Sequence, residues 1–190
     1  MVFAAGGGTL DRMTVDLDSV IIRAATPQDA ARIAQVHVTS WQSAYAELLP
    51  ADYLADLDPD VRAGRWASVL STKEGSATAG HVLVAEQDGR TLGFASFGLS
   101  ADEDAEPGTY ELYAMYLEPG AWGRGVAREL MRTVLASIPA GAVMTLWVLD
   151  GNDRAQHFYR RHGFHPDGVE RIDEIGGVPL TELRFRRPGA

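Results

Sequence analysis

The 190-residue chain contains no cysteine, so disulfide bonds, thiolate metal sites and a cysteine nucleophile are excluded. It also has no apolar run that approaches the length of a membrane-spanning helix, so we expect no membrane partner. The first residues, MVFAAGGGTLDRM, lack a basic start and are interrupted by glycines. That pattern argues against a signal peptide and makes the cytoplasm the expected compartment.

Basic residues are outnumbered: 17 Lys and Arg against 26 Asp and Glu give a formal net charge of -9. Because nucleic-acid binding needs a basic face, nucleic acid is not an expected partner. The acidity would suit a cationic small molecule or a basic peptide, or it could serve solubility alone. Hydrophobic residues make up 46% of the chain and charged residues 23%, a balance ordinary for a globular domain with a sizeable core.

Two parts of the chain differ in composition. Residues 1–19 are rich in glycine, alanine and aspartate, and we expect them to form a flexible N-terminal extension. Residues 20–187 show no internal repeat and no long linker, so we expect them to form a single domain.

The first half of this domain predicts one strand and several helices. Residues 20–26 are strand-like, and the following Thr-Pro-Gln-Asp provides a helix cap, a first-turn proline and an acid. These signals predict a helix that continues to about Ser40. Prolines introduce two further short helices, expected within residues 48–58 and 58–70.

The second half is dominated by strand patterns. Two strand-like runs flank Asp88-Gly89, a strong hairpin signal, and residues 109–118 form a third run rich in tyrosine. A helix with an apolar stripe, a buried strand, a helix capped by Asn152 and ended by Gly163, and two last strands follow. The stripe places four apolar residues at intervals of four: Val126, Leu130, Val134 and Ile138. Strand, crossover helix and strand in this order predict a parallel pair within a mixed α/β sheet.

The segment LEPGAWGRGVAREL, residues 117–130, lies where the stripe-bearing helix begins. The helix lacks a Ser, Thr, Asp or Asn cap, and arginines rather than acids are expected in its first turn. Free amide groups and the helix dipole would make this end an anion site, and the glycines would let a bulky anion approach. No Gly-Lys-Ser/Thr ending marks a Walker loop, and Arg128 stands where a dinucleotide fingerprint needs glycine. A glycine-rich turn with solvated arginines remains the alternative.

Together with the segment at residues 147–164, this loop resembles the two core motifs of the GNAT superfamily of acetyl-CoA-dependent N-acetyltransferases. Residues 122–127 match the first motif, Gln/Arg-Gly-x-Gly-x-Gly/Ala, except that Trp122 replaces its leading residue. The second motif is matched with every spacing kept by Asn152, Ala155, Phe158, Tyr159, Gly163 and Phe164. The resemblance covers residues 20–187 and implies a mixed, mostly antiparallel twisted sheet with a central parallel pair and flanking helices.

The resemblance also implies where acetyl-CoA, the co-substrate, would bind. Backbone amides of residues 122–127 would hold the pyrophosphate, with Arg124 and Arg128 nearby, and the strand edge at residues 115–117 would receive the pantetheine arm. Asn152 would hold that arm from the other side in addition to capping its helix. The full implied set is Met115, Tyr116, Leu117, Trp122, Gly123, Arg124, Gly125, Val126, Ala127, Arg128, Asn152, Ala155 and Phe158.

Two residues are catalytic candidates for attack of an amine on the thioester. A lysine-type amine is mostly protonated at neutral pH, so a base assists the attack, and an acid assists departure of the sulfur. Glu111 is the base candidate, because burial of its strand would raise its pKa. Tyr159, which the resemblance places near the thioester sulfur, is the acid candidate. A salt-bridged strand glutamate and a packing tyrosine are the respective alternatives.

Aromatic residues of the early helices mark the region that covers the acceptor site in this family. Trp41 and Tyr45 are candidate acceptor-binding residues together with Glu111, whereas core packing is the expected role of most other aromatics there, such as Tyr53 and Trp66. The acidic loop at residues 101–108 could attract a cationic acceptor or be solvated. We expect no metal site, because Gly163 separates His162 from His165.

The leading hypothesis is therefore an N-acetyltransferase that moves an acetyl group from acetyl-CoA to a primary amine by direct attack in a ternary complex. Direct transfer is favoured because the chain lacks cysteine and a Gly-x-Ser-x-Gly elbow. A protein N-terminal or lysine acetyltransferase and a non-catalytic acyl-CoA sensor are the alternatives. Many members of the family form homodimers, so the resemblance also implies a homodimer, and the acceptor it implies is a small-molecule or peptide amine.

Overall fold

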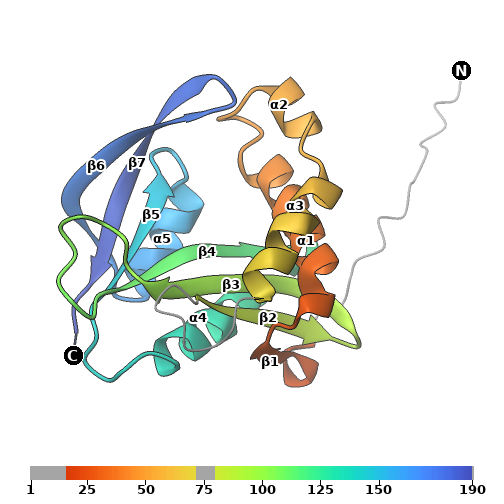
Figure 1. Ribbon diagram of the computed structural model, residues 1–190, viewed down its shortest axis with the longest axis horizontal. Coiled ribbons are helices and arrows are strands. Elements are labelled where there is room, and N and C mark those ends of the chain that lie inside the picture. Colours follow the sequence, from red (N-terminus) through yellow and green to blue (C-terminus); the bar gives the residue numbers. More distant parts are fainter. Residues whose placement is uncertain (1–15, 72–79, 190) are drawn as a thin grey trace, which may run out of the picture.

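The computed structural model describes residues 16–71 and 80–189 and consists of one sheet covered by helices on both faces (Figure 1). Seven strands form the sheet in the order β1-β2-β3-β4-β5-β7-β6. Their bounds are Ile21–Ala24 (β1), His81–Gln87 (β2), Arg90–Leu99 (β3), Tyr110–Leu117 (β4), Met144–Leu149 (β5), His165–Ile175 (β6) and Val178–Arg187 (β7). All neighbours are antiparallel except β4 and β5, which are parallel, as the crossover pattern predicts.

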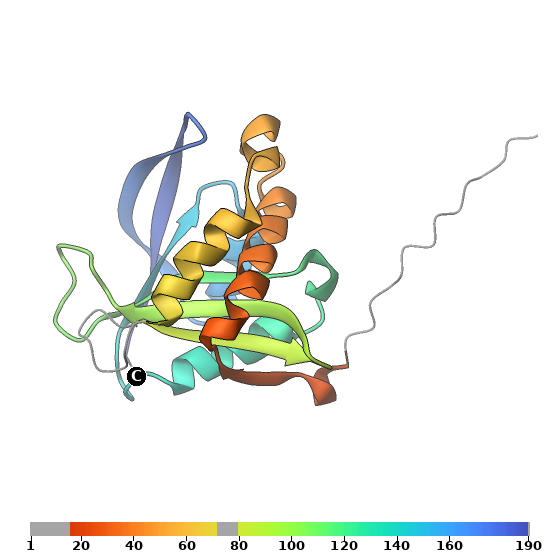
Figure 2. The same ribbon diagram turned by 45° about the vertical axis from the view of Figure 1, so that its right-hand side comes forward.

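The helices divide between the two faces of the sheet (Figure 2). Their bounds are Ala30–Ala44 (α1), Ala51–Ala55 (α2), Pro59–Leu70 (α3), Val126–Ala136 (α4) and Asp153–Arg161 (α5), with short 3-10 helices at Leu17–Ser19, Pro27–Asp29 and Pro119–Ala121. Helices α1 and α3 cover β2–β4 through a cluster that includes Ile33, Val36 and the fully buried Phe94. Helices α4 and α5 cover the opposite face through a larger cluster that includes Leu130 and Phe164.

The apolar stripe of α4 is confirmed, with one change at its end. Val126, Leu130 and Val134 are fully buried, whereas Ile138 lies beyond the helix, which ends at Ala136. Ile138 is nevertheless 8% exposed and belongs to the same cluster. The four-residue spacing therefore identified buried residues correctly and overestimated the helix by less than one turn.

Residues Leu17–Ser19, at the end of the expected N-terminal extension, form a 3-10 helix. The Leu17 side chain lies against Gly125, where an added Cβ would stand 2.7 Å from Leu17 Cδ1. Residues 1–15 of the extension lie outside the described residues.

A bulge in β4 shapes the centre of the molecule. The register between β3 and β4 shifts between Ser96 and Phe97, because Phe97 pairs with Leu112 while Ser96 pairs with Ala114. Tyr113 is thus the extra residue on β4, and such a bulge bends its strand. Strands β4 and β5 pair only from Tyr110 to Leu112, so the rest of β4 diverges from β5. The backbone edge of residues 113–117 therefore faces a cavity instead of a neighbouring strand.

Candidate functional site

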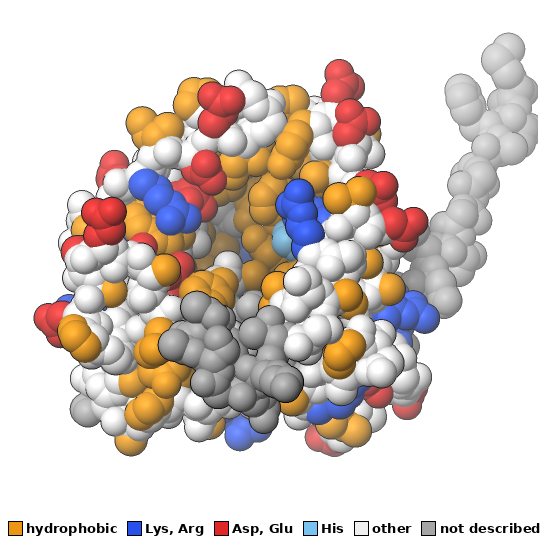
Figure 3. Space-filling view, in the orientation of Figure 1, with side chains coloured by type: hydrophobic (Ala, Val, Ile, Leu, Met, Phe, Trp, Pro, Cys, Tyr) orange, Lys and Arg blue, Asp and Glu red, His pale blue; other side chains and the backbone are white. Residues whose placement is uncertain are grey.

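A cavity of about 990 Å³ occupies the space where β4 and β5 diverge. It extends from the glycine loop before α4 to the aromatic residues of α1 and the β6–β7 hairpin. Figure 3 shows the hollow between the helices and the strands, with hydrophobic side chains gathered inside it. Of the residues expected at the site, these line it: Trp41, Tyr45, Glu111, Met115, Tyr116, Leu117, Trp122, Gly123, Gly125, Ala127, Arg128, Asn152, Ala155, Phe158 and Tyr159.

The first turn of α4 presents backbone donors toward one end of this cavity. Gly125 is the N-cap in the left-handed conformation, with φ 87°, and no side chain caps the helix. Trp122 N, expected among the free amides, donates instead to Pro119 O at 3.2 Å. Glu129 N donates to Gly125 O, but within the described residues no backbone oxygen accepts from the amides of residues 123–128. A run of such amides at a helix N-terminus fits a phosphate group.

The expectation of a first turn without acids is wrong, because Glu129 falls within it. Its carboxylate lies 3.5 Å from Arg128 Nε and 2.8 Å from Arg132 Nη2. These arginines are thus already compensated in part, and the case for an anion at this loop depends on the free amides rather than on uncompensated arginine charge.

Two residues of the loop have structural contacts that do not involve the cavity. The Arg124 Nε donates to Gly120 O at 2.9 Å, and the Val126 side chain is fully buried against the core. Neither side chain lines the cavity, so any contact of these two residues with a ligand would be made by their amides.

Trp122, the departure from the family pattern, connects the two sides of the cavity. Its indole Nε1 donates to Leu117 O at 3.1 Å, and the Arg154 guanidinium of α5 lies over its ring at 4.2 Å from the centroid. Arg154 was not predicted from the sequence, because only the packing of α5 against the loop brings it there. It adds a cation to the end of the cavity where the glycine loop lies.

Asn152 is the N-cap of α5 and lines the cavity together with residues of β4. Its Oδ1 accepts from Ala155 N at 3.1 Å, which confirms the predicted helix cap. The Asn152 side chain also hydrogen-bonds the Tyr45 phenol, and that bond acts to lower the pKa of the phenol, which burial raises.

Glu111 enters the cavity near the point where β4 and β5 diverge. Burial is the main reason that the pKa of its carboxyl is raised, and the negative charge of Asp102 adds to that effect. Ser100 Oγ donates to Glu111 Oε2 at 3.2 Å and so fixes one carboxylate oxygen. A partly buried carboxylate with a raised pKa is suited to accept a proton near neutral pH.

Tyr159 projects from α5 into the same cavity. Its ring packs edge-on against Phe158 and Phe164, with centroids 5.5 and 6.0 Å away. Burial raises the pKa of the phenol, so the side chain remains a proton donor at neutral pH.

The aromatic residues of α1 form the other end of the cavity. Trp41 and Tyr45 line it, with ring centroids 5.2 Å apart, whereas Tyr53 and Trp66 pack in apolar clusters outside it. His37 was not predicted, although it precedes Trp41 and Tyr45 at the same four-residue spacing, which places all three on one face of a helix. Its ring stacks on Tyr116 at 4.8 Å.

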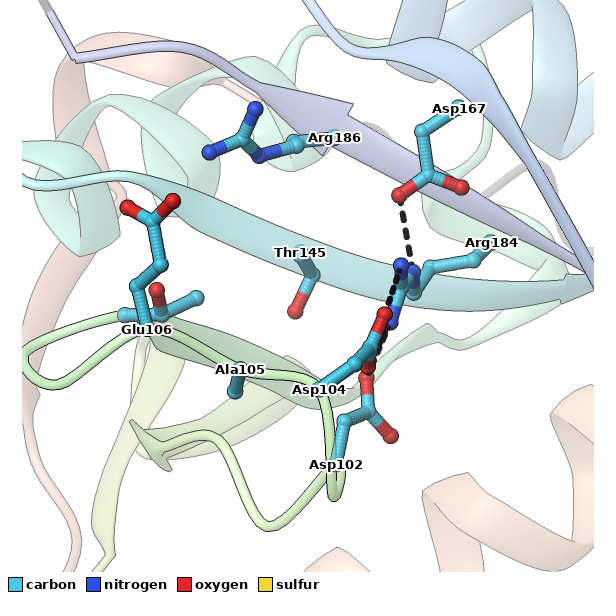
Figure 4. Close-up of a pocket in the computed structure, with 9 residues that line it drawn as sticks. Asp102, Asp104, Ala105, Glu106, Thr145, Asp167, Arg184 and Arg186 are labelled. Atoms are coloured by element: carbon cyan, nitrogen blue, oxygen red, sulfur yellow. Dashed lines mark hydrogen bonds and ion pairs between the residues drawn. The ribbon is translucent and has the colours of Figure 1, made fainter.

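The acidic loop between β3 and β4 is anchored to the sheet by Arg184 of β7 (Figure 4). Arg184 is 8% exposed, and its guanidinium binds Asp104 at 2.6 Å, Asp167 at 2.8 Å and Asp102 at 3.4 Å. Trp147 Nε1 also donates to Asp102 Oδ1 at 3.2 Å. The carboxylates of Asp102 and Asp104 are therefore neither simply solvated nor available to attract a cationic acceptor, because both form ion pairs with Arg184.

Two absences are recorded for the described residues. Residues 16–71 and 80–189 contain no cluster of three or more His, Asp or Glu side chains arranged to hold a metal ion. In the same part of the chain, no helix is long and apolar enough to cross a membrane.

The fold and cavity resemble those of an acyl-CoA-binding transferase, with free loop amides at one end and with Glu111 and Tyr159 both in the cavity lining. Residues 39–164 match the acetyltransferase (GNAT) family, and the chain belongs to that family, whose members are N-acetyltransferases that use acetyl-CoA.

Relatives along most of the chain carry the same family name. The N-acetyltransferase YuaI of Bacillus subtilis is 31% identical over 89% of this chain and 93% of its own length. The N-alpha-acetyltransferase RimI of Mycobacterium tuberculosis is also 31% identical, over 90% of this chain and 96% of its own length. The PaiA N-acetyltransferase of Thermoplasma acidophilum, solved with coenzyme A, superimposes with a TM-score of 0.66 at 18% identity. The match covers 90% of this chain and 99% of that one, and it shows a shared fold.

Proposed function

We propose that this protein transfers the acetyl group of acetyl-CoA to the primary amine of a small molecule, by direct attack within a ternary complex. The single observation that carries the proposal is the continuous cavity, which joins the free amides before α4 to Glu111, Tyr159 and the aromatic wall of α1. One cavity can therefore hold the acyl donor and the acceptor together.

The donor would lie along the β4 side of the cavity. The amides of residues 123–128 and Arg154 would hold the pyrophosphate, because they are directed donors and a cation at a helix N-terminus. The edge of residues 115–117 has no neighbouring strand and would bind the pantetheine amides as an added strand would, with Leu117 O already accepting from Trp122 Nε1. Asn152, at the start of α5, lines the same cavity. Acetyl-CoA supplies the thioester carbonyl and the thiolate leaving group.

Glu111 and Tyr159 would move the protons. Glu111, with its raised pKa, accepts a proton from the ammonium form of the acceptor, directly or through water. Tyr159 donates its phenolic proton toward the leaving sulfur, since its raised pKa keeps that proton in place until negative charge develops nearby.

A thiol-release assay over a panel of amines tests the proposal. Tyr159→Phe should lower kcat by roughly 10²-fold or more, in line with the loss of a general acid, with acetyl-CoA affinity nearly unchanged. Glu111→Gln should remove the acid limb from the dependence of kcat/KM on pH. Full turnover in Tyr159→Phe would exclude the acid role. Coenzyme A binding without thiol release for any amine would favour a non-catalytic sensor.

A protein acceptor is the second candidate, supported by the name of the relative RimI as an N-alpha-acetyltransferase. The contacts at the acceptor end support a small molecule instead. Ile175 and Leu180 of the β6–β7 hairpin pack against a cluster formed by Tyr45, Leu49 and Leu54. The hairpin and the α1–α2 region therefore meet, which narrows the path that a polypeptide would take. Comparison of free amines with peptides bearing the same amine distinguishes the two.

A further inference from the structure

Five arginines line the cavity: Arg62, Arg128, Arg154, Arg161 and Arg171. Arg171 and Arg62, which lie on β6 and α3, have different surroundings. Arg171 of β6 binds Glu182 with Nε 2.7 Å from Oε2, and its guanidinium lies over Trp147 at 4.2 Å from the ring centroid. A nearby carboxylate thus already compensates its charge.

Arg62 of α3 has only uncharged partners within the described residues. Its Nη1 lies 3.4 Å from His37 Nε2, and its guanidinium lies over the Trp41 ring at 5.2 Å from the centroid. Burial, assisted by the charge of Arg62 itself, lowers the pKa of His37 to about 3, so the imidazole is neutral. The ring accepts one hydrogen bond from Arg62 and contributes no charge.

The geometry at Arg62 suits a planar oxyanion. A guanidinium has five N–H donors in a fixed fork, and the contact with His37 involves Nη1 alone. The guanidinium carbon lies over the Trp41 ring, and within the described residues His37 is the one side chain that accepts a hydrogen bond from the group, which leaves donors for a ligand. A carboxylate is the planar group that this fork binds with two parallel hydrogen bonds.

We propose that the acceptor is a small amine that also carries a carboxylate, which Arg62 binds while the amine faces Glu111. This proposal rests on the proposed transferase function and names its substrate class. Both residues line one cavity, from α3 and from β4, and Asp173 of β6 lines it as well. The cavity wall therefore carries an uncompensated cation and separate carboxylates, a pattern complementary to an amino acid rather than to a simple amine or a polyamine.

Matched acceptor pairs test the substrate class. Each amino acid is compared with the amine that lacks its carboxylate, and a series of ω-amino acids varies the distance between the two groups. The carboxylate-bearing member of the best pair should have a kcat/KM higher by roughly 10- to 100-fold, the effect expected of a charge-assisted hydrogen-bonded pair. Equal values for both members at every chain length would overturn the proposal.

Substitutions then assign the preference to Arg62. Arg62→Gln should reduce the ratio of kcat/KM between the paired acceptors toward one, mainly through KM, and Arg62→Lys should retain part of it because the charge remains. The matched control is Arg65→Gln, an exposed arginine of α3 outside the cavity, which should keep the full ratio. If the role of Arg62 were purely structural, Arg62→Gln would lower kcat/KM equally for both acceptors and leave their ratio unchanged. That result would overturn the proposal.

Calorimetric titration separates this proposal from the proposed function. Amino acids are titrated into the protein saturated with coenzyme A, and binding that weakens in Arg62→Gln supports the carboxylate site even if no thiol is ever released. Thiol release from simple amines, with no amino acid binding, would contradict the carboxylate site and leave the transferase intact.

Discussion

At the scale of single residues, the protonation of Glu111 depends on the charge of Asp102. That charge is the second cause of the raised pKa of Glu111, after burial, and Arg184 and Trp147 hold Asp102 in place. Asp102→Asn removes the negative charge, so the pKa of Glu111 should fall. Because the proposed base acts in its deprotonated form, the acid limb of kcat/KM should move to lower pH, as measured in a pH-rate profile.

The control for this prediction is Glu103→Gln, which removes the same charge from an exposed position of the same loop. It should leave the acid limb in place, because Glu103 is not among the groups that shift the pKa of Glu111. An acid limb that moves equally in both variants, or in neither, would show that Asp102 has no specific influence on Glu111.

The residues of the site could be predicted where a motif or a helix period marks them. Asn152 and Tyr159 belong to a spaced motif, and the four-residue interval from Trp41 to Tyr45 predicts a shared helix face. Arg62 could not be predicted, because its place in the cavity depends on how α3 packs beside α1. Arg154 likewise depends on the contact of α5 with Trp122.

At the scale of elements, the proposed pyrophosphate site combines the glycine loop with the first turn of α4. Gly125 has φ 87°, which disfavours any side chain, and an added Cβ would also meet Leu17 at 2.7 Å. Gly125→Asp adds a negative charge beside the free amides as well. We expect the affinity of this variant for coenzyme A to fall by at least ~10-fold. The new carboxylate and a neighbouring phosphate would repel each other by more than ~1.4 kcal/mol in a partly buried site. Calorimetry measures the affinity.

Gly89→Asp provides the matched control for the loop. Gly89 has φ 76° in the turn between β2 and β3, with open space where a Cβ would lie, and it does not line the cavity. Both variants should lose stability to urea by about 1 kcal/mol through the strained backbone. Only Gly125→Asp should lose coenzyme A binding. Normal coenzyme A binding by Gly125→Asp would rule out the phosphate-cradle role of the loop.

The helices and strands follow closely from sequence signals, whereas the divergence of β4 from β5 does not. Caps, prolines and the Asp88-Gly89 turn marked each helix and strand boundary to within a few residues. The opening between β4 and β5 arises from the extra residue at Tyr113, and a bulge leaves no mark in a run of tyrosines and leucines. Short apolar runs show that a strand exists but not where its pairing ends.

At the scale of the whole molecule, an ion pair joins the N-terminal strand to the first helical turn. Arg23 of β1 binds both carboxylate oxygens of Asp29 at 2.8 Å, and it also binds Glu86 of β2. The hydrogen bonds from Arg23 lower the pKa of Asp29 from 3.8 to about 2. A depressed pKa gives stability that is present above pH 3.8 and is lost as the pH falls through about 2.

Asp29→Asn should therefore lower the free energy of unfolding by about 1–2 kcal/mol at pH 7, a value reduced to allow for solvent at Arg23. The difference from the unmodified protein should narrow between pH 4 and pH 2, as followed by urea unfolding. Asp56→Asn, at an exposed position, should show no such difference. If the difference in the free energy of unfolding between Asp29→Asn and the unmodified protein stays constant with pH, the ion pair is not the source of that difference.

The size of acceptor that the molecule admits should depend on the contact between α2 and the β6–β7 hairpin. Gly176 at the hairpin turn lies against Tyr53, so closely that an added Cβ would stand 2.6 Å from Tyr53 Cγ. Tyr53→Ala removes the ring that fills this contact, and the acceptor end of the cavity should widen. The ratio of kcat/KM for a dipeptide amine over the corresponding single amino acid should rise, as measured by thiol release.

Tyr53→Phe is the control, because it keeps the ring against Gly176 and removes only the hydroxyl. Its ratio should match that of the unmodified protein. A lower melting temperature in Tyr53→Ala is expected from the lost packing, and it does not affect the test, since the ratio compares two acceptors on one enzyme. An unchanged ratio in Tyr53→Ala would mean that this contact does not limit the acceptor, and it would remove the structural argument against a peptide acceptor.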